Sequence, residues 1–193
     1  MMRRGLALIA FGIFIQAARA EEPPEGWEEL KTASGRARTF VPKGQLKETT
    51  SGTPTTGGIK AKIEVTYSAS EALGLFGMAH AEYPKEAAKD SKKALAHMRA
   101  FLLKIQDARV TSEKRITYGD KKYPGLEYVA ESTYQGQRRA IAARIYLIEG
   151  HGIAVYTTAP PNGNPAKEIE QFFKSFQWQS ESDEKAKPGP EKK

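Results

Sequence analysis

The chain of 193 residues contains no cysteine. This absence excludes disulfide bonds, zinc–thiolate sites, iron–sulfur clusters, thiol nucleophiles and a lipid-modified cysteine. Disulfides are common in exported domains, so an exported form of this chain must be stabilised by its hydrophobic core alone. The length allows that, because a domain of about 150 residues buries most of the surface that its unfolded chain exposes.

The sequence also lacks an apolar run of the roughly 20 residues that a membrane-spanning helix needs. Its longest run, Leu6–Ile15, follows Arg3 and Arg4 and precedes Ala18-Arg19-Ala20. A positive start, a short apolar stretch and small residues at the end are typical of a secretory signal peptide. We therefore predict that residues 1–20 are cleaved after Ala20, and that the product is periplasmic or secreted without a membrane span. The alternative is an uncleaved anchor.

The net positive charge of the chain is small once the predicted signal peptide is removed. The first twenty residues carry three arginines and no acid, so the formal charge falls from +7 to about +4 in a mature chain of about 173 residues. A mildly basic chain of this size does not indicate a nucleic-acid binder. Nucleic acid is therefore not expected among the partners.

Apolar residues are scarce at both ends of the mature chain. Residues 21–26 are rich in Pro and Glu, and residues 180–193 mix Lys, Glu, Pro and Gly. Such segments cannot bury enough surface to offset the entropy lost on ordering. We expect a mobile lead-in, a disordered charged tail and one domain over residues 27–179.

Residues that commonly carry catalysis or bind metal are few. The three histidines are His80, His97 and His151, and only His80 and Glu82 share a face of one predicted strand. Two ligands do not make a metal site, so His97 and His151 are expected to be exposed. The G-x-S-x-G, H-E-x-x-H, P-loop and G-x-G-x-x-G motifs are absent. The prediction is a non-enzymatic protein without a metal or cofactor.

The hydrophobic periodicity that is present predicts an α+β fold with a mostly antiparallel sheet, a central helix and a C-terminal helix. Strands are expected at residues 27–33, 36–41, 59–67, 73–83, 109–118, 126–134, 138–149 and 153–158, and a loop without packing residues at 49–58. The central helix lies within residues 85–105, and its ordered part is capped by Asp90 or Ser91. Its apolar face comprises Leu95, Met98, Leu102 and Ile105.

The C-terminal helix has a clear start at Asn164, a good cap, followed by Pro165. Its phenylalanines should pack on the sheet. Two tight turns predict hairpins. With Gly136-Gln137 at the centre of the first, Ala130 lies opposite Ala143, and Arg144 lies diagonally from Glu131. With Gly150-His151 at the centre of the second, Ile148 lies opposite Ile153. Both registers align the apolar sides of the paired strands.

The order of landmarks along the chain resembles the PsbP-like fold family, which includes DcrB-like envelope proteins. The residues that carry the resemblance are Phe40-Val41-Pro42, the helix near Leu95–Ile105, Arg115–Gly119, Pro124–Glu127, Arg144–Leu147, Gly150-His151-Gly152 and Phe172–Phe176. Many such relatives have a basic residue after the turn glycine. This chain departs from them, because it has His151 and Gly152 there. The resemblance implies an α/β/α sandwich that serves as a binding or accessory module, and it carries over no metal or catalytic residue.

Two groups of charged residues are candidates for an interaction surface. Lys85, Lys89, Lys92 and Arg99 fall near one helical face, where they could meet an anionic partner or form a solvated helix surface. Glu127 and Glu131 share a strand face, and either a cross-strand ion pair with Arg144 or a solvated sheet face is favoured over acid/base catalysis.

The predicted function follows from the export signal, the missing catalytic motifs and the resemblance. We expect an exported soluble domain that binds an envelope or extracellular protein, or an anionic envelope component. The alternatives are a carrier of a small apolar or anionic ligand held between sheet and helices and, less favoured, a hydrolase.

Overall fold

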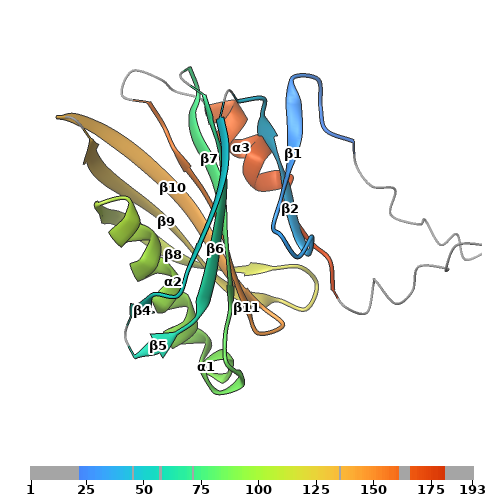
Figure 1. The fold of residues 1–193 in the computed structure, drawn as a ribbon, viewed down its shortest axis with the longest axis vertical. Coiled ribbons are helices and arrows are strands. Elements are labelled where there is room, and N and C mark those ends of the chain that lie inside the picture. Colours follow the sequence, from blue (N-terminus) through green and yellow to red (C-terminus); the bar gives the residue numbers. More distant parts are fainter. Residues whose placement is uncertain are drawn as a thin grey trace, which may run out of the picture.

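The computed structural model describes residues 22–44, 46–56, 58–70, 72–134, 136–160 and 166–180. The predicted signal peptide, the tail after residue 180 and the predicted cap at Asn164-Pro165 lie outside these residues. A twisted seven-stranded sheet forms the centre of the molecule, with two consecutive helices on one face and a helix and a small sheet on the other (Figure 1). None of the helices in the described ranges is long and apolar enough to cross a bilayer.

The large sheet is antiparallel throughout, which confirms the predicted α+β class with mostly antiparallel strands. In spatial order its strands are β3 (Leu46–Gly52), β6 (Lys62–Ser70), β7 (Gly74–Glu82), β11 (His151–Thr158), β10 (Gln137–Ile148), β9 (Tyr123–Tyr134) and β8 (Ala108–Tyr118). Strands β8 to β11 follow one another as a meander. The meander returns beside β7, and the connection from β7 to β8 carries the two helices of one face.

The prediction of a loop at residues 49–58 is wrong, because most of these residues form strands. Strand β3 pairs with β6 at the edge of the large sheet, and β4 (Thr55–Thr56) and β5 (Ile59–Lys60) form a separate two-stranded ribbon. Residues 48–52 of β3 are exposed. An edge strand that contributes no core residue there shows no apolar alternation, and the sequence pattern therefore did not reveal it.

The two predicted hairpins form, but each pairing differs by two positions from the prediction. Ala130 lies opposite Ile141, and Ile148 lies opposite His151. In the second turn the central residues are Glu149 and Gly150, with φ angles of 52° and 86°, as a type I′ turn requires. A shift of two residues leaves every side chain on its predicted face. The predicted side-chain faces are therefore confirmed, and the predicted cross-strand partners are wrong.

Helices α1 (Lys85–Lys89) and α2 (Ser91–Ile105) are separated at Asp90. The Asp90 carboxylate accepts a hydrogen bond from the Lys93 backbone nitrogen at 3.0 Å, which confirms the predicted cap. Leu95, Met98 and Leu102 are buried against the sheet, whereas Ile105 is 49% exposed. Ile105 is the last residue of the helix and lies at the margin of its buried face, which explains the difference from the prediction.

The opposite face of the large sheet is covered by α3 (Ala166–Lys174) and a sheet with the order β1 (Trp27–Lys31), β2 (Ala37–Pro42), β12 (Gln177–Trp178). Phe172 of α3 is fully buried, with its ring edge-on to Phe76 at 5.3 Å. Strand β12 has two residues, too few for a periodic pattern to predict it.

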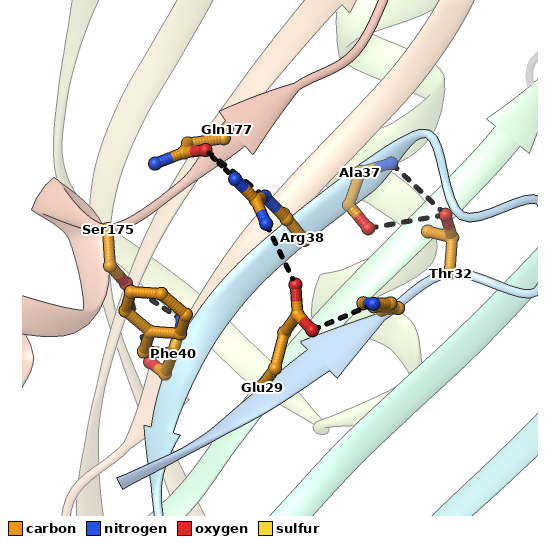
Figure 2. Close-up of polar contacts among 8 residues, drawn as sticks. Glu29, Thr32, Ala37, Arg38, Phe40, Ser175 and Gln177 are labelled. Atoms are coloured by element: carbon orange, nitrogen blue, oxygen red, sulfur yellow. Dashed lines mark hydrogen bonds and ion pairs between the residues drawn. The ribbon is translucent and has the colours of Figure 1, made fainter. Parts of the chain in front are cut away.

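Polar contacts hold the small sheet together (Figure 2). The Arg38 guanidinium donates to Gln177 Oε1 at 2.6 and 3.1 Å and to Glu29 Oε1 at 3.2 Å. Ser175 Oγ accepts a hydrogen bond from the Phe40 nitrogen at 2.9 Å. These bonds join all three strands of the small sheet and the end of α3.

Candidate functional site

A groove of about 650 Å³ lies between α2 and strands β8 and β9. Its apolar wall is formed by Leu95, Ala96, Pro124 and Leu126. Its polar lining comprises Ser91, Lys92, Arg99, Glu113, Lys114 and Arg115. The Lys114 side chain points to the other face of the sheet, where it pairs with Glu127. Lys92, Arg99 and Arg115 against the single acid Glu113 therefore give the groove a net positive charge. Its shape and charge suit an anionic, partly apolar ligand.

The basic residues of the groove come from both the helix α2 and the strand β8. Lys92 and Arg99 are seven residues apart on α2, so they project from the same side of the helix. Arg115 of β8 lies opposite Leu126 of β9, and both line the groove. Arg99 forms an ion pair with Glu113, which bridges the helix to the strand. The sequence did not indicate Arg115 as a site residue, because its position beside α2 depends on the strand order.

Unused hydrogen-bonding groups lie beneath the groove. Arg99 Nε is buried and has no hydrogen-bond partner within the described ranges, and the same holds for the Tyr128 hydroxyl. Tyr128 is 1% exposed, and burial is the main cause that raises its pKa, so the hydroxyl stays protonated at neutral pH. Of these two groups Arg99 lines the groove, so the site retains one donor that no described side chain satisfies.

The other members of the predicted lysine group lie outside the groove. Lys85 and Lys89 belong to the short helix α1, and Lys89 pairs with Glu86 at 2.8 Å. The break at Asp90 separates α1 from α2. The structure therefore brings Lys92 and Arg99 into one site and leaves Lys85 and Lys89 on a neighbouring exposed helix.

Glu127, Glu131 and Arg144 lie on the opposite face of the sheet from the groove floor. Arg144 is directly opposite Glu127, with 2.7 Å between Nε and Oε2, and its guanidinium lies 4.7 Å from the Phe173 ring centroid. Glu131 pairs with Arg138 instead. The predicted cross-strand ion pair is confirmed, but its expected alignment was wrong because the register is shifted by two residues.

The histidines depart most from expectation. His97 was expected to be exposed, yet it is 3% exposed, and its Nδ1 lies 3.0 Å from the Tyr83 hydroxyl. Tyr83 follows β7 and reaches the inner face of α2, which covers that histidine. His151 was also expected to be exposed, but it is half-buried, with its Nδ1 3.1 Å from Nε2 of His80.

Strand pairing explains this second contact. Strands β7 and β11 are neighbours, and His151 lies directly opposite Glu82, two positions from His80 and on the same face. The two histidines are 71 residues apart in sequence, so no local spacing indicated the contact. His80, Glu82 and His151 each offer one potential ligand atom, and these atoms lie within 4.8 Å of one another.

Comparison with known proteins identifies a fold and no family. No family model and no curated protein matches the sequence. The structure is similar to the solution structure of cyanobacterial PsbP (CyanoP) from Synechocystis sp. PCC 6803, with a TM-score of 0.53 and 11% identity over 80% of this chain and 93% of that chain. The chain thus has the PsbP-like fold that its sequence resembles.

A crystal structure from Bacteroides thetaiotaomicron is also similar, at 13% identity and a TM-score of 0.46. The match covers 81% of this chain and 50% of that one. At these identities the similarity describes the fold alone, because one fold hosts many functions.

Proposed function

We propose that this protein is an exported, non-enzymatic binding domain whose site is the groove between α2 and strands β8 and β9. Its partner is an acidic segment of an envelope or extracellular protein, or another anionic envelope component. The observation that carries the proposal is the set of basic side chains, Lys92, Arg99 and Arg115, around an apolar floor. Export rests on the signal-peptide pattern of residues 1–20.

The composition of the groove favours binding over catalysis. Its one acid, Glu113, is held in an ion pair with Arg99, so it is poorly placed to act as a general acid or base. The unsatisfied Arg99 Nε can donate to a carboxylate or phosphate. The apolar floor can accept a leucine-sized side chain next to that charge.

The proposal can be tested with a fluorescent peptide rich in Glu and Leu, titrated into the purified protein. A double variant carrying Lys92→Glu and Arg115→Glu reverses two exposed charges that line the groove. We expect the affinity for the acidic peptide to fall by at least ~10-fold, because like charges now face each other at a short distance. Affinity should also fall as salt is raised, since the contact is partly exposed.

The matched control carries Lys43→Glu and Lys167→Glu, which changes the net charge by the same amount at exposed positions away from the groove. This control should bind the peptide with nearly the affinity of the parent. Equal loss in both double variants would show that only net charge matters, and the groove would then not be the site.

A second candidate function is carriage of a small ligand. The groove volume of about 650 Å³ lies within the range of about 300–1,000 Å³ typical of small-molecule sites. Protein purified from its own host should then show a bound anionic or apolar mass by native mass spectrometry, and that mass should be lost on Leu95→Glu substitution in the groove wall. A spectrum of the bare chain alone would count against a carrier.

A further inference from the structure

A second polar cluster lies on the other face of the large sheet, away from the groove. It contains His80 at 5% exposure, the half-buried His151 and the exposed Glu82. The ring of Trp178 lies against both histidines, with centroid distances of 6.4 and 5.3 Å. The small sheet therefore covers one side of this pair of imidazoles, and the exposed Glu82 lies next to them on the same face.

The spacing of the two imidazole nitrogens is close to what a metal ion requires. His80 Nε2 and His151 Nδ1 are 3.1 Å apart. Two nitrogens bound to one tetrahedral ion at 2.0–2.1 Å would be about 3.3 Å apart. A small outward movement would allow both to bind the same ion. Because Glu82 is exposed, its carboxylate can rotate to supply a third ligand.

A second carboxylate besides that of Glu82 lies beside His80. Glu64 lies opposite His80 on β6, and its carboxylate accepts a hydrogen bond from the Ala33 nitrogen at 2.6 Å.

Arg36 determines the hydrogen positions in the metal-free pair. Its Nη1 lies 3.2 Å from His151 Nε2, and because a guanidinium can only donate, that nitrogen must accept. The proton of neutral His151 is then on Nδ1 and is donated to Nε2 of His80. An ion bound to His151 Nδ1 would move this proton to Nε2, where it would face another donor. Arg36 must therefore withdraw when an ion binds.

We propose that His80, His151 and Glu82 form a binding site for one divalent transition-metal ion of the zinc and copper class, and that Arg36 competes with the ion for His151. Two imidazoles and one carboxylate are typical ligands of such ions, whereas Ca²⁺ and Mg²⁺ prefer sites made of oxygen. Three protein ligands leave a fourth position open to solvent or to a ligand from a partner.

The test uses the full-length protein, expressed with its own leader and purified without a histidine tag. Zn²⁺ is titrated against a chelating indicator, and Mg²⁺ is the comparison ion. We expect one Zn²⁺ per chain and no competition from Mg²⁺. His151→Gln and Glu82→Gln should each weaken Zn²⁺ binding by at least ~10-fold. Arg36→Gln should strengthen it severalfold, since the competing donor is gone.

Matched controls separate a built site from general histidine and carboxylate binding. His97→Gln removes the histidine of the opposite face, and Glu86→Gln removes an exposed carboxylate on α1; both should bind Zn²⁺ as the parent does. Unchanged affinity in Glu82→Gln and His151→Gln, with native circular dichroism, would overturn the proposal. Binding that does not saturate at one ion per chain would also overturn it.

A second readout locates the ion. The chain has two tryptophans, and Trp178 lies beside the histidine pair. Cu²⁺ bound there should quench the fluorescence of the protein, and Trp178→Phe should abolish most of that quenching while one Cu²⁺ still binds. Quenching that survives in Trp178→Phe would place the ion elsewhere.

Discussion

Glu127 pairs with two bases on the face of the sheet opposite to the groove. Its carboxylate contacts Lys114 Nζ at 2.6 Å and Arg144 Nε at 2.7 Å. Burial raises the pKa of Glu127, but the hydrogen bonds from these two bases outweigh that effect and lower it overall. A carboxyl with a lowered pKa in the folded state stabilises the fold above its unfolded pKa, and this contribution is lost as pH falls through the folded value.

Glu127→Gln should therefore destabilise the protein by about 1 kcal/mol at pH 7, and by less as pH falls below about 4. The reason is that protonated Glu127 can no longer pair with the two bases. Urea unfolding at a series of pH values between 3 and 7 measures the difference. Glu131→Gln is the control, because its partner Arg138 is largely exposed. A loss for Glu127→Gln that is equal at both ends of the pH range would contradict this account.

At the scale of single elements, the start of helix α2 depends on one side chain. Asp90 caps the helix through the Lys93 nitrogen, and that backbone hydrogen bond is the main cause that lowers its pKa. Asp90→Ala should lower the melting temperature by about 2–4 °C, as loss of a cap does in a domain of this size. Asp90→Asn keeps an acceptor at the same position and should retain most of the stability. Thermal unfolding followed at 222 nm compares the two variants.

Elements with a clear period could be predicted, and those without one could not. Strand β6 alternates buried Ile63 and Val65 with more exposed neighbours, and α2 repeats Leu95, Met98 and Leu102 on one side. The edge strand β3 and the two-residue β12 have no such pattern. The hairpin registers were wrong by two residues because glycine at either central position is compatible with a tight turn.

The candidate sites were only partly predictable for a different reason. Lys92 and Arg99 could be placed on one helical face from their spacing. Arg115 joins them only because β8 lies at the end of the sheet beneath α2, and His151 meets His80 only because β7 and β11 are neighbours. Strand order is set by the packing of the whole chain, and local spacing does not contain it.

At the scale of the whole molecule, one sheet supports two separate hydrophobic clusters. Strand β7 contributes Phe76 and Met78 to the cluster beneath α3, and Ala79 and Ala81 to the cluster beneath α2. Residues that alternate along one strand thus belong to both clusters. Loss of packing on either face should therefore loosen the strand that the other face needs, and the described residues should unfold as one unit.

Leu102→Ala tests this coupling. Leu102 is fully buried beneath α2, so the change should cost about 2–5 kcal/mol. Both tryptophans pack on the opposite cluster, and their fluorescence reports a face that the substitution does not touch. If the sheet couples the faces, denaturant unfolding followed by fluorescence and by circular dichroism should shift to the same lower midpoint.

Ile105→Ala removes a similar side chain from the same helix at a position that is 49% exposed, and it should change the midpoint little. A fluorescence midpoint that stays at the parent value in Leu102→Ala, while the helical signal is lost earlier, would mean that the two faces unfold independently. The groove on the α2 face and the histidine cluster on the other would then sit on units that can open separately. A common shift would mean that the two faces fold together. An ion bound at His80 and His151 would then also stabilise the helix that lines the groove, because the ion binds the folded state of the whole sheet.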